Sequence, residues 1–155
     1  MLMVHETVDE DLWRDHADEL LRFATVLVGP SDAYDIVADA MLRAAAHVNS
    51  PDVINKRAYL YRAVANRATD QRRSQQRRWR RELAGIGPAV TTQPDDFADV
   101  RRAVAGLAVS QRAVVYFTYW EDLPERTIAE MLHLSPGTVH RSLERARATL
   151  RKALA

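Results

Sequence analysis

Apolar side chains recur every three or four positions along most of the chain, which is the spacing of one face of an α-helix. No run of valine, isoleucine or threonine alternates with polar residues as a half-buried strand would. The pattern therefore predicts an all-α protein. Its two clearest stripes are Trp13, Ala17, Leu20, Ala24 and Leu27, then Ile36, Val37, Ala40, Met41, Ala44 and Val48.

Helix-breaking residues separate these stripes. The Gly29-Pro30 pair ends the first helix, and Ser31 or Asp32 can cap the second. A third helix is expected from about residue 55, and it runs into an arginine-rich segment at 72–81.

Residues 84–96 are rich in glycine, proline and threonine and show little periodicity, which is typical of a linker. We therefore expect two small helical domains, 1–83 and 97–155, that are not fixed relative to each other. The second domain is expected to begin with a helix that buries Phe97, Val100, Val104 and Leu107. A further helix, capped by Ser110, is expected to end near Trp120.

The last 33 residues predict a helix-turn-helix, the motif that places a helix in the DNA major groove. Pro124 lies in the first turn of a short helix, and Ser135-Pro136 starts the next. Val139, Leu143, Ala146 and Leu150 form the buried stripe of that second helix.

The opposite face of the last helix is expected to bind DNA, because arginine can bond guanine and glutamate can accept from cytosine. The candidates are Thr138, His140, Arg141, Glu144 and Arg145, with Arg126 and Arg147 as phosphate contacts.

A second polar and mostly cationic stripe lies on the third helix and includes Arg62, Asn66 and Arg73, with Tyr59 beside it. Aromatic faces next to cationic groups suit unpaired bases. An ordinary solvated face with core tyrosines explains the same stripe equally well.

The second helix has an acidic outer face with Asp35 and Asp39, and Leu42 is apolar away from the buried stripe. An apolar strip flanked by carboxylates suggests docking to a partner helix. An ordinary surface with one exposed leucine remains an alternative.

Charge is unevenly distributed, although the whole chain carries only +1. The net charge is −5 over residues 1–70, +2 over 71–100 and +4 over 101–155. The acidic N-terminal part and the basic C-terminal part can therefore face different partners.

We find no cysteine, no phosphate-binding loop and no histidine spacing typical of a zinc site, so we expect no catalytic residue, metal or cofactor. No apolar run predicts a signal peptide or a membrane span.

Several ordered segments resemble the extracytoplasmic-function (group IV) sigma factors of bacterial RNA polymerase. They are 12–24, 32–44, 58–70 and 107–147, and the resemblance covers about residues 10–83 and 98–153. It implies an alternative sigma factor that binds core polymerase, recognises the −10 and −35 promoter elements and aids promoter melting. It also implies a cytoplasmic, nucleoid-associated protein that is a monomer outside the holoenzyme.

The resemblance implies roles for particular residues. The second helix would dock on the β′ clamp coiled coil through Asp35, Ala38, Asp39, Met41 and Leu42. The third helix would recognise the −10 element through Tyr59, Arg62, Asn66, Arg67 and Arg73. The domain at 97–155 would contact the −35 element and the β flap, and many members of this family are inhibited by an anti-sigma factor.

Several positions depart from the family pattern. Ala38 replaces a usual glutamine, His133 a usual turn glycine, and His140-Arg141-Ser142 a usual Lys-Ser-Arg. We therefore expect an unusual −35 preference. Two other functions stay open from the sequence: a stand-alone helix-turn-helix regulator, and a sigma-like adaptor that binds polymerase without initiating transcription.

Overall fold

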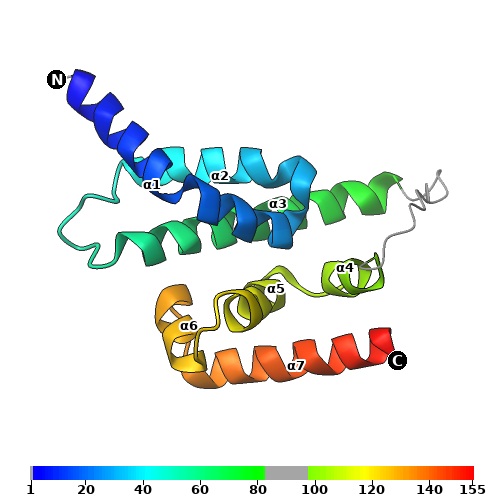
Figure 1. The fold of residues 1–155 in the computed structure, drawn as a ribbon. Coiled ribbons are helices and arrows are strands. Elements are labelled where there is room, and N and C mark those ends of the chain that lie inside the picture. The colour runs from blue at the N-terminus through cyan, green and yellow to red at the C-terminus, as the bar shows by residue number, and fades with distance from the viewer. Residues whose placement is uncertain (1, 83–97) are drawn as a thin grey trace.

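The computed structural model describes the backbone of residues 2–82 and 98–155, and the side chains of residues 10–75 and 99–155. Every regular element in these ranges is a helix (Figure 1). The predicted linker at 84–96 and the predicted core residue Phe97 lie outside the described residues.

The first domain consists of three long helices, α1 (Leu2–Val28), α2 (Pro30–Ala45) and α3 (Lys56–Glu82). The predicted stripes meet in its core, where Leu20, Leu27, Val37 and Val48 are fully buried. Trp13 is only half-buried and packs against the edge of this core.

The expected cap of α2 is wrong. Gly29, not Ser31 or Asp32, occupies the N-cap position, and its φ of 87° lies in the region that glycine adopts most easily. Pro30 is the first helical residue, where a missing N–H costs nothing. This glycine therefore allows α2 to follow α1 with only one residue between the two helices.

The second domain contains α4 (Ala98–Ala105), α5 (Val109–Val115), a π-helical turn η1 (Tyr116–Trp120), α6 (Glu125–Leu132) and α7 (Pro136–Leu154). The expected Ser110 cap is wrong, because Ala108 is the N-cap and Gln111 Oε1 accepts its N–H at 3.2 Å. The expected stripe of α4 is also partly wrong. Val100 is 44% exposed, while Ala103 is buried.

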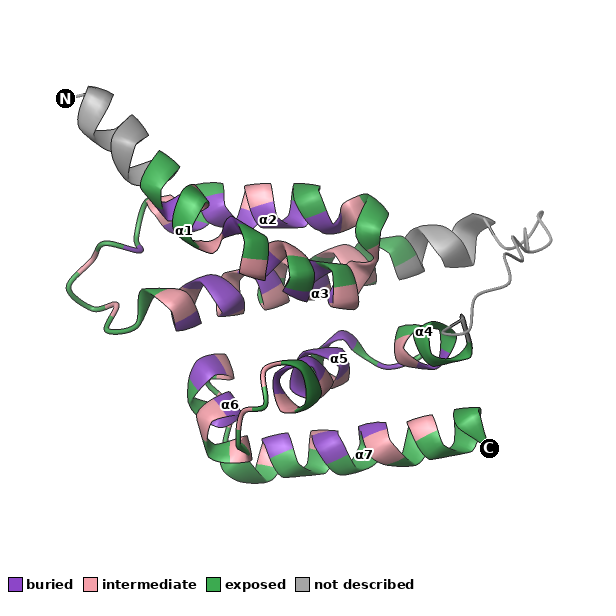
Figure 2. Cartoon of the chain, in the orientation of Figure 1, coloured by how far each residue is buried: buried purple, intermediate pink, exposed green. Residues whose placement is uncertain are grey.

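The two domains pack against each other, contrary to the expectation that they are not fixed. Figure 1 shows α5 and α6 lying beneath α3, with α7 on their far side. Phe23 and Tyr61 of the first domain lie 5.0 Å apart between ring centroids. The Phe23 ring lies 5.1 Å from the rings of Tyr116 and Phe117 in the second domain, and the Tyr61 ring lies 5.1 Å from that of Phe117. All four rings are buried, so one apolar core continues across the domain boundary (Figure 2).

Arg112 is the one buried charged side chain among the residues described, at 3% exposure, and it lies at this boundary. Its guanidinium donates to the carbonyl oxygens of Leu107 (3.0 Å) and Ala105 in its own domain, and to that of Leu27 in the first domain. Burial, with a smaller contribution from the nearby Arg72, lowers the pKa of Arg112 to about 10. The group stays charged at neutral pH and forms charge-assisted hydrogen bonds to both domains.

A second polar contact joins the domains at the start of α3. Arg57 Nε donates to Glu19 of α1 at 3.0 Å, and its Nη2 lies 3.8 Å from Glu121, just after η1. Arg57 also lies over the Tyr61 ring, 5.2 Å from its centroid. The packing between the domains therefore combines an aromatic centre with two arginines.

Candidate nucleic-acid interface

Helix α6, the turn after it and α7 form the predicted helix-turn-helix. His133, which replaces a usual turn glycine, ends α6 in the left-handed region, with φ 53° and ψ 44°. Ser135 Oγ accepts the backbone N–H of Thr138 at 3.1 Å, and Pro136 is the first residue of α7. The expected cap is confirmed, and it fixes where α7 begins.

The outer face of α7 is exposed, as predicted, because Val139, Leu143 and Ala146 bury the opposite face. Arg126 of α6 is also exposed. The polar side chains exposed on the outer face are His140, Arg141, Glu144 and Arg145.

The first turn of α7 positions Arg141. Its Nη2 donates to Thr138 Oγ1 at 3.3 Å, and Thr138 Oγ1 lies 2.8 Å from Ser135 Oγ. A Cβ at Gly137 would lie 3.4 Å from Arg141 Nη1, so this glycine leaves the guanidinium room. Arg141 keeps other N–H groups that can face a base or a phosphate.

Arg147, a predicted phosphate contact, has partners within its own domain. Its Nε donates to Tyr119 Oη at 2.8 Å, and its Nη1 donates to Glu144 Oε1 at 3.3 Å. Its guanidinium carbon also lies 5.9 Å from the centre of the Tyr119 ring. Tyr119 and Glu144 therefore hold Arg147 at the edge of the outer face. Sequence reasoning missed Tyr119, whose partner is 28 residues away.

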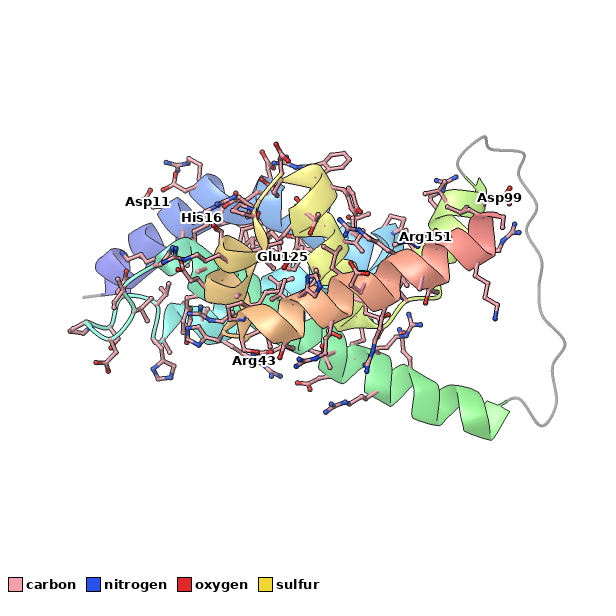
Figure 3. All side chains as sticks on the ribbon, turned by 90° about the horizontal axis from the view of Figure 1, so that it is seen from below. Asp11, His16, Arg43, Asp99, Glu125 and Arg151 are labelled. Carbon is pink, nitrogen blue, oxygen red and sulfur yellow. The ribbon has the colours of Figure 1, made fainter. Side chains whose placement is uncertain are left out.

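His140 is paired with a residue of α6. Its Nδ1 lies 3.1 Å and 3.2 Å from the two carboxylate oxygens of Glu125. In Figure 3, which views the molecule from the side of α7, Glu125 is labelled where α6 meets the start of α7. Sequence reasoning missed Glu125, because a contact across the turn does not follow the i, i+4 spacing of one helix.

The predicted −10 face of α3 is only partly exposed. Asn66 and Arg73 are exposed, whereas Tyr59 and Arg62 are half-buried. Arg62 Nη1 donates to the carbonyl oxygen of Met131 in α6 at 3.2 Å. The helix-turn-helix therefore lies against part of the surface that the sequence assigns to promoter DNA.

Arg67, another predicted −10 residue, binds a residue assigned to polymerase docking. Its Nε donates to Asp39 Oδ2 of α2, and Arg43 Nε lies 3.5 Å from the same oxygen. The structure thus places Arg67 and Asp39 together in one ion pair between α2 and α3.

The predicted docking face of α2 adjoins an apolar groove of ≈ 680 Å³ between α1 and α2. Leu42 is 73% exposed, as expected, and Asp35 is exposed beside it. Met41 is buried and Ala38 is half-buried, so both contribute to the floor of the groove. Sequence reasoning placed Trp13 in the core and missed Tyr34. These two rings line the groove and contact each other edge to face, with centroids 5.6 Å apart.

Within the described residues, no helix combines the length and apolar character that a bilayer crossing demands. The same part of the chain contains no group of three or more histidine, aspartate or glutamate side chains placed to bind a metal ion.

Two family models match successive parts of the chain. Residues 12–78 match sigma-70 region 2, and residues 97–150 match sigma-70 region 4. The first match covers the α1–α3 domain, and the second covers the domain that ends in the helix-turn-helix.

Relatives of known function match almost the whole chain. The RNA polymerase sigma-E factor of Streptomyces coelicolor is 34% identical, over 94% of this chain and 85% of its own length. The ECF RNA polymerase sigma factor SigM of Mycobacterium tuberculosis is 31% identical, over 94% and 76%. The sigma factor RpoE of Bartonella quintana, solved in complex with the anti-sigma factor NepR, has a similar fold. It is 22% identical, with a TM-score of 0.72 over 94% of this chain and 95% of that one. The chain therefore belongs to the sigma-70 family of RNA polymerase sigma factors, within its extracytoplasmic-function group.

Proposed function

We propose that this sigma factor recognises the −35 element of its promoters with the outer face of α7. The observation that carries the assignment is the exposure of four polar side chains on one face of a capped helix that follows a tight turn. Arg126 and Arg147 are the proposed phosphate contacts, and Thr138 positions Arg141. The proposed base-contacting residues are His140, Arg141, Glu144 and Arg145.

The −10 element is assigned to α3, through Tyr59, Arg62, Asn66 and Arg73. Arg67 is retained here only as a residue that orients α3, because its guanidinium is bound to Asp39. In the packed form, Arg62 donates one N–H to Met131 of α6, so α6 lies against part of this proposed DNA surface. Recognition of both promoter elements therefore requires α6 to leave α3.

Core polymerase is assigned to the α1–α2 groove and the acidic face beside it. Leu42 and Asp35 supply the exposed part of this surface, and Met41 and Ala38 supply its floor. The corresponding domain limits are 1–83 for promoter −10 recognition and polymerase docking, 84–96 for the linker and 97–155 for −35 recognition.

The chain itself catalyses no reaction in this proposal, and the polymerase forms the phosphodiester bonds. The sigma factor acts on the nucleoid in the cytoplasm as a monomer that joins core polymerase. An anti-sigma factor is a proposed partner, in line with the complex in which the Bartonella sigma factor was solved. The stand-alone regulator and the adaptor are not favoured, because the relatives that match 94% of the chain are sigma factors.

Run-off transcription tests the proposal. The purified chain, core polymerase and candidate promoters of the cognate genome should give transcripts with defined starts. Arg145→Ala should reduce transcription from promoters with a −35 element by at least about tenfold, since it removes a group that can bond a base edge.

Gel filtration with core polymerase separates docking from recognition. Arg145→Ala should bind core polymerase as the unaltered chain does. Arg102→Ala, which removes an exposed arginine of α4, should leave both readouts unchanged. The absence of specific transcripts from every promoter would refute the function, and an equal loss of core binding would refute the assignment of faces.

A further inference from the structure

The pairing of His140 with Glu125 bears on which base this helix selects. His140 lies on the outer face of α7 with its side chain 58% exposed, and Glu125 is the first residue of α6. The two side chains come from different helices of the motif, 15 residues apart. The ring is thus held at one nitrogen, and its other nitrogen is left for a ligand.

We infer that Glu125 fixes the tautomer of His140, so that Nε2 faces the major groove as a hydrogen-bond acceptor. An ionised carboxylate has no proton to donate, and both of its oxygens lie within 3.2 Å of Nδ1. The hydrogen of the neutral imidazole must then be on Nδ1, and Nε2 carries the lone pair. The inference rests on the proposed −35 role of α7 and adds a base class to it.

An acceptor selects particular bases in the major groove. Only adenine N6 and cytosine N4 donate there, whereas guanine and thymine present acceptors at the corresponding positions. The base that faces His140 is therefore one that carries an exocyclic amino group. A lysine at this position would not select for an amino group, because its ammonium group only donates.

The second polar residue of the face does not offer the same selection. Arg141 donates to Thr138 and has only N–H groups to present to a base. His140 and Arg141 are adjacent in the sequence, so the helix presents an acceptor and a donor side by side. This combination gives a physical basis for the unusual −35 preference expected from the sequence.

Selection from a promoter library tests the inference. Full-length chain with core polymerase would be bound to promoters randomised across the −35 element at pH 8.5, well above the ordinary range of histidine titration. The position that depends on His140 is the one whose base preference disappears in His140→Ala. On the DNA strand that faces His140, adenine or cytosine should be enriched there about fivefold over guanine and thymine, the effect of one net hydrogen bond.

Glu125→Gln is the decisive variant, because its amide can either accept or donate and no longer fixes the tautomer. It should reduce the enrichment at this position to about twofold or less and leave the other −35 positions unchanged. Glu130→Gln removes the same charge from an exposed position of the same helix and should keep the full enrichment.

Several outcomes would overturn the inference. Guanine or thymine at the His140-dependent position, on the DNA strand that faces His140, would show that Nε2 donates. Unchanged enrichment in Glu125→Gln would show that the carboxylate has no part in selection, and an equal loss at all positions would show a merely structural role. If neither His140→Ala nor Arg145→Ala changes any −35 preference, the proposed role of α7 fails as well. If only Arg145→Ala does, the −35 role stands and the inference alone fails.

Discussion

Single residues at helix ends decide where the DNA-facing helix starts. Ser135 accepts the N–H of Thr138, while His133 takes the left-handed conformation that lets the chain turn before it. The sequence predicted both, because serine before proline and a non-helical turn are local signals. The cap of α2 was missed, since a glycine at the N-cap gives no side-chain signal and the nearby Ser31 and Asp32 do.

Removal of the Ser135 hydroxyl should destabilise the second domain. Ser135→Ala leaves the N–H of Thr138 without its partner, which costs about 1 kcal/mol of unfolding free energy. Urea denaturation followed by circular dichroism measures this difference. Ser31→Ala is the matched control, because Ser31 is exposed and does not cap α2, and it should change stability by less than about 0.5 kcal/mol.

At the scale of helices, α1 and α3 are joined by the Glu19–Arg57 ion pair. Burial by itself would raise the pKa of Glu19, but the hydrogen bonds from His16 and Arg57 outweigh it, so the pKa lies below its ordinary value of 4.5. The folded protein therefore binds fewer protons at this site than the unfolded chain does. Stability from the pair is present above the ordinary pKa and is lost as the pH falls through the lowered one.

Unfolding free energy should accordingly decrease as the pH falls from about 5 toward 3, and Glu19→Gln should make this decrease shallower. Thermal unfolding across this pH range measures both slopes. Asp18→Asn is the control, because this neighbouring carboxylate is exposed, and it should keep the slope of the unaltered chain. Parallel slopes for Glu19→Gln and the unaltered chain would contradict the role given to the pair.

The sequence predicted the helices well where a stripe is local and continuous. The predicted stripe residues of α2 and the following turn, from Ile36 to Val48, are buried as expected, and so are Val139, Leu143 and Ala146 of α7. The sequence did not predict η1. Its π-helical turn shifts the register of Tyr116 and Phe117, and a 3.6-residue period does not reveal such a shift. The sequence also failed at Val100, where the short helix α4 buries Ala103 instead.

At the scale of the whole molecule, the packing of the two domains could not be predicted from the sequence. Phe23, Tyr61 and Phe117 each fit the core of their own domain, and only the structure shows that they contact one another. The contact has a functional cost, since α6 lies against Arg62 of the proposed −10 surface. Promoter binding and domain packing therefore compete for the same guanidinium.

Removal of the Arg112 guanidinium should loosen this packing. Arg112→Met retains an apolar side chain of comparable length but removes the guanidinium donor from the carbonyl oxygens of Leu27 and Leu107, at a cost of roughly 1–3 kcal/mol each if they stay buried. Small-angle X-ray scattering should show a larger radius of gyration, with helix content unchanged by circular dichroism. Arg102→Ala should retain the dimensions of the unaltered chain. A compact Arg112→Met variant would show that the hydrogen bonds of Arg112 are not needed to hold the domains together.

The buried hydrogen bonds of Arg112 to carbonyl oxygens should respond to ionic strength differently from contacts between arginines and DNA phosphates. Contacts between arginines and phosphates weaken steeply as electrolyte is added, because they displace condensed counterions. A guanidinium enclosed with neutral carbonyls has no counterion to exchange and is shielded little by dissolved ions. High salt should therefore dissociate this chain from nucleic acid while its two domains remain packed together.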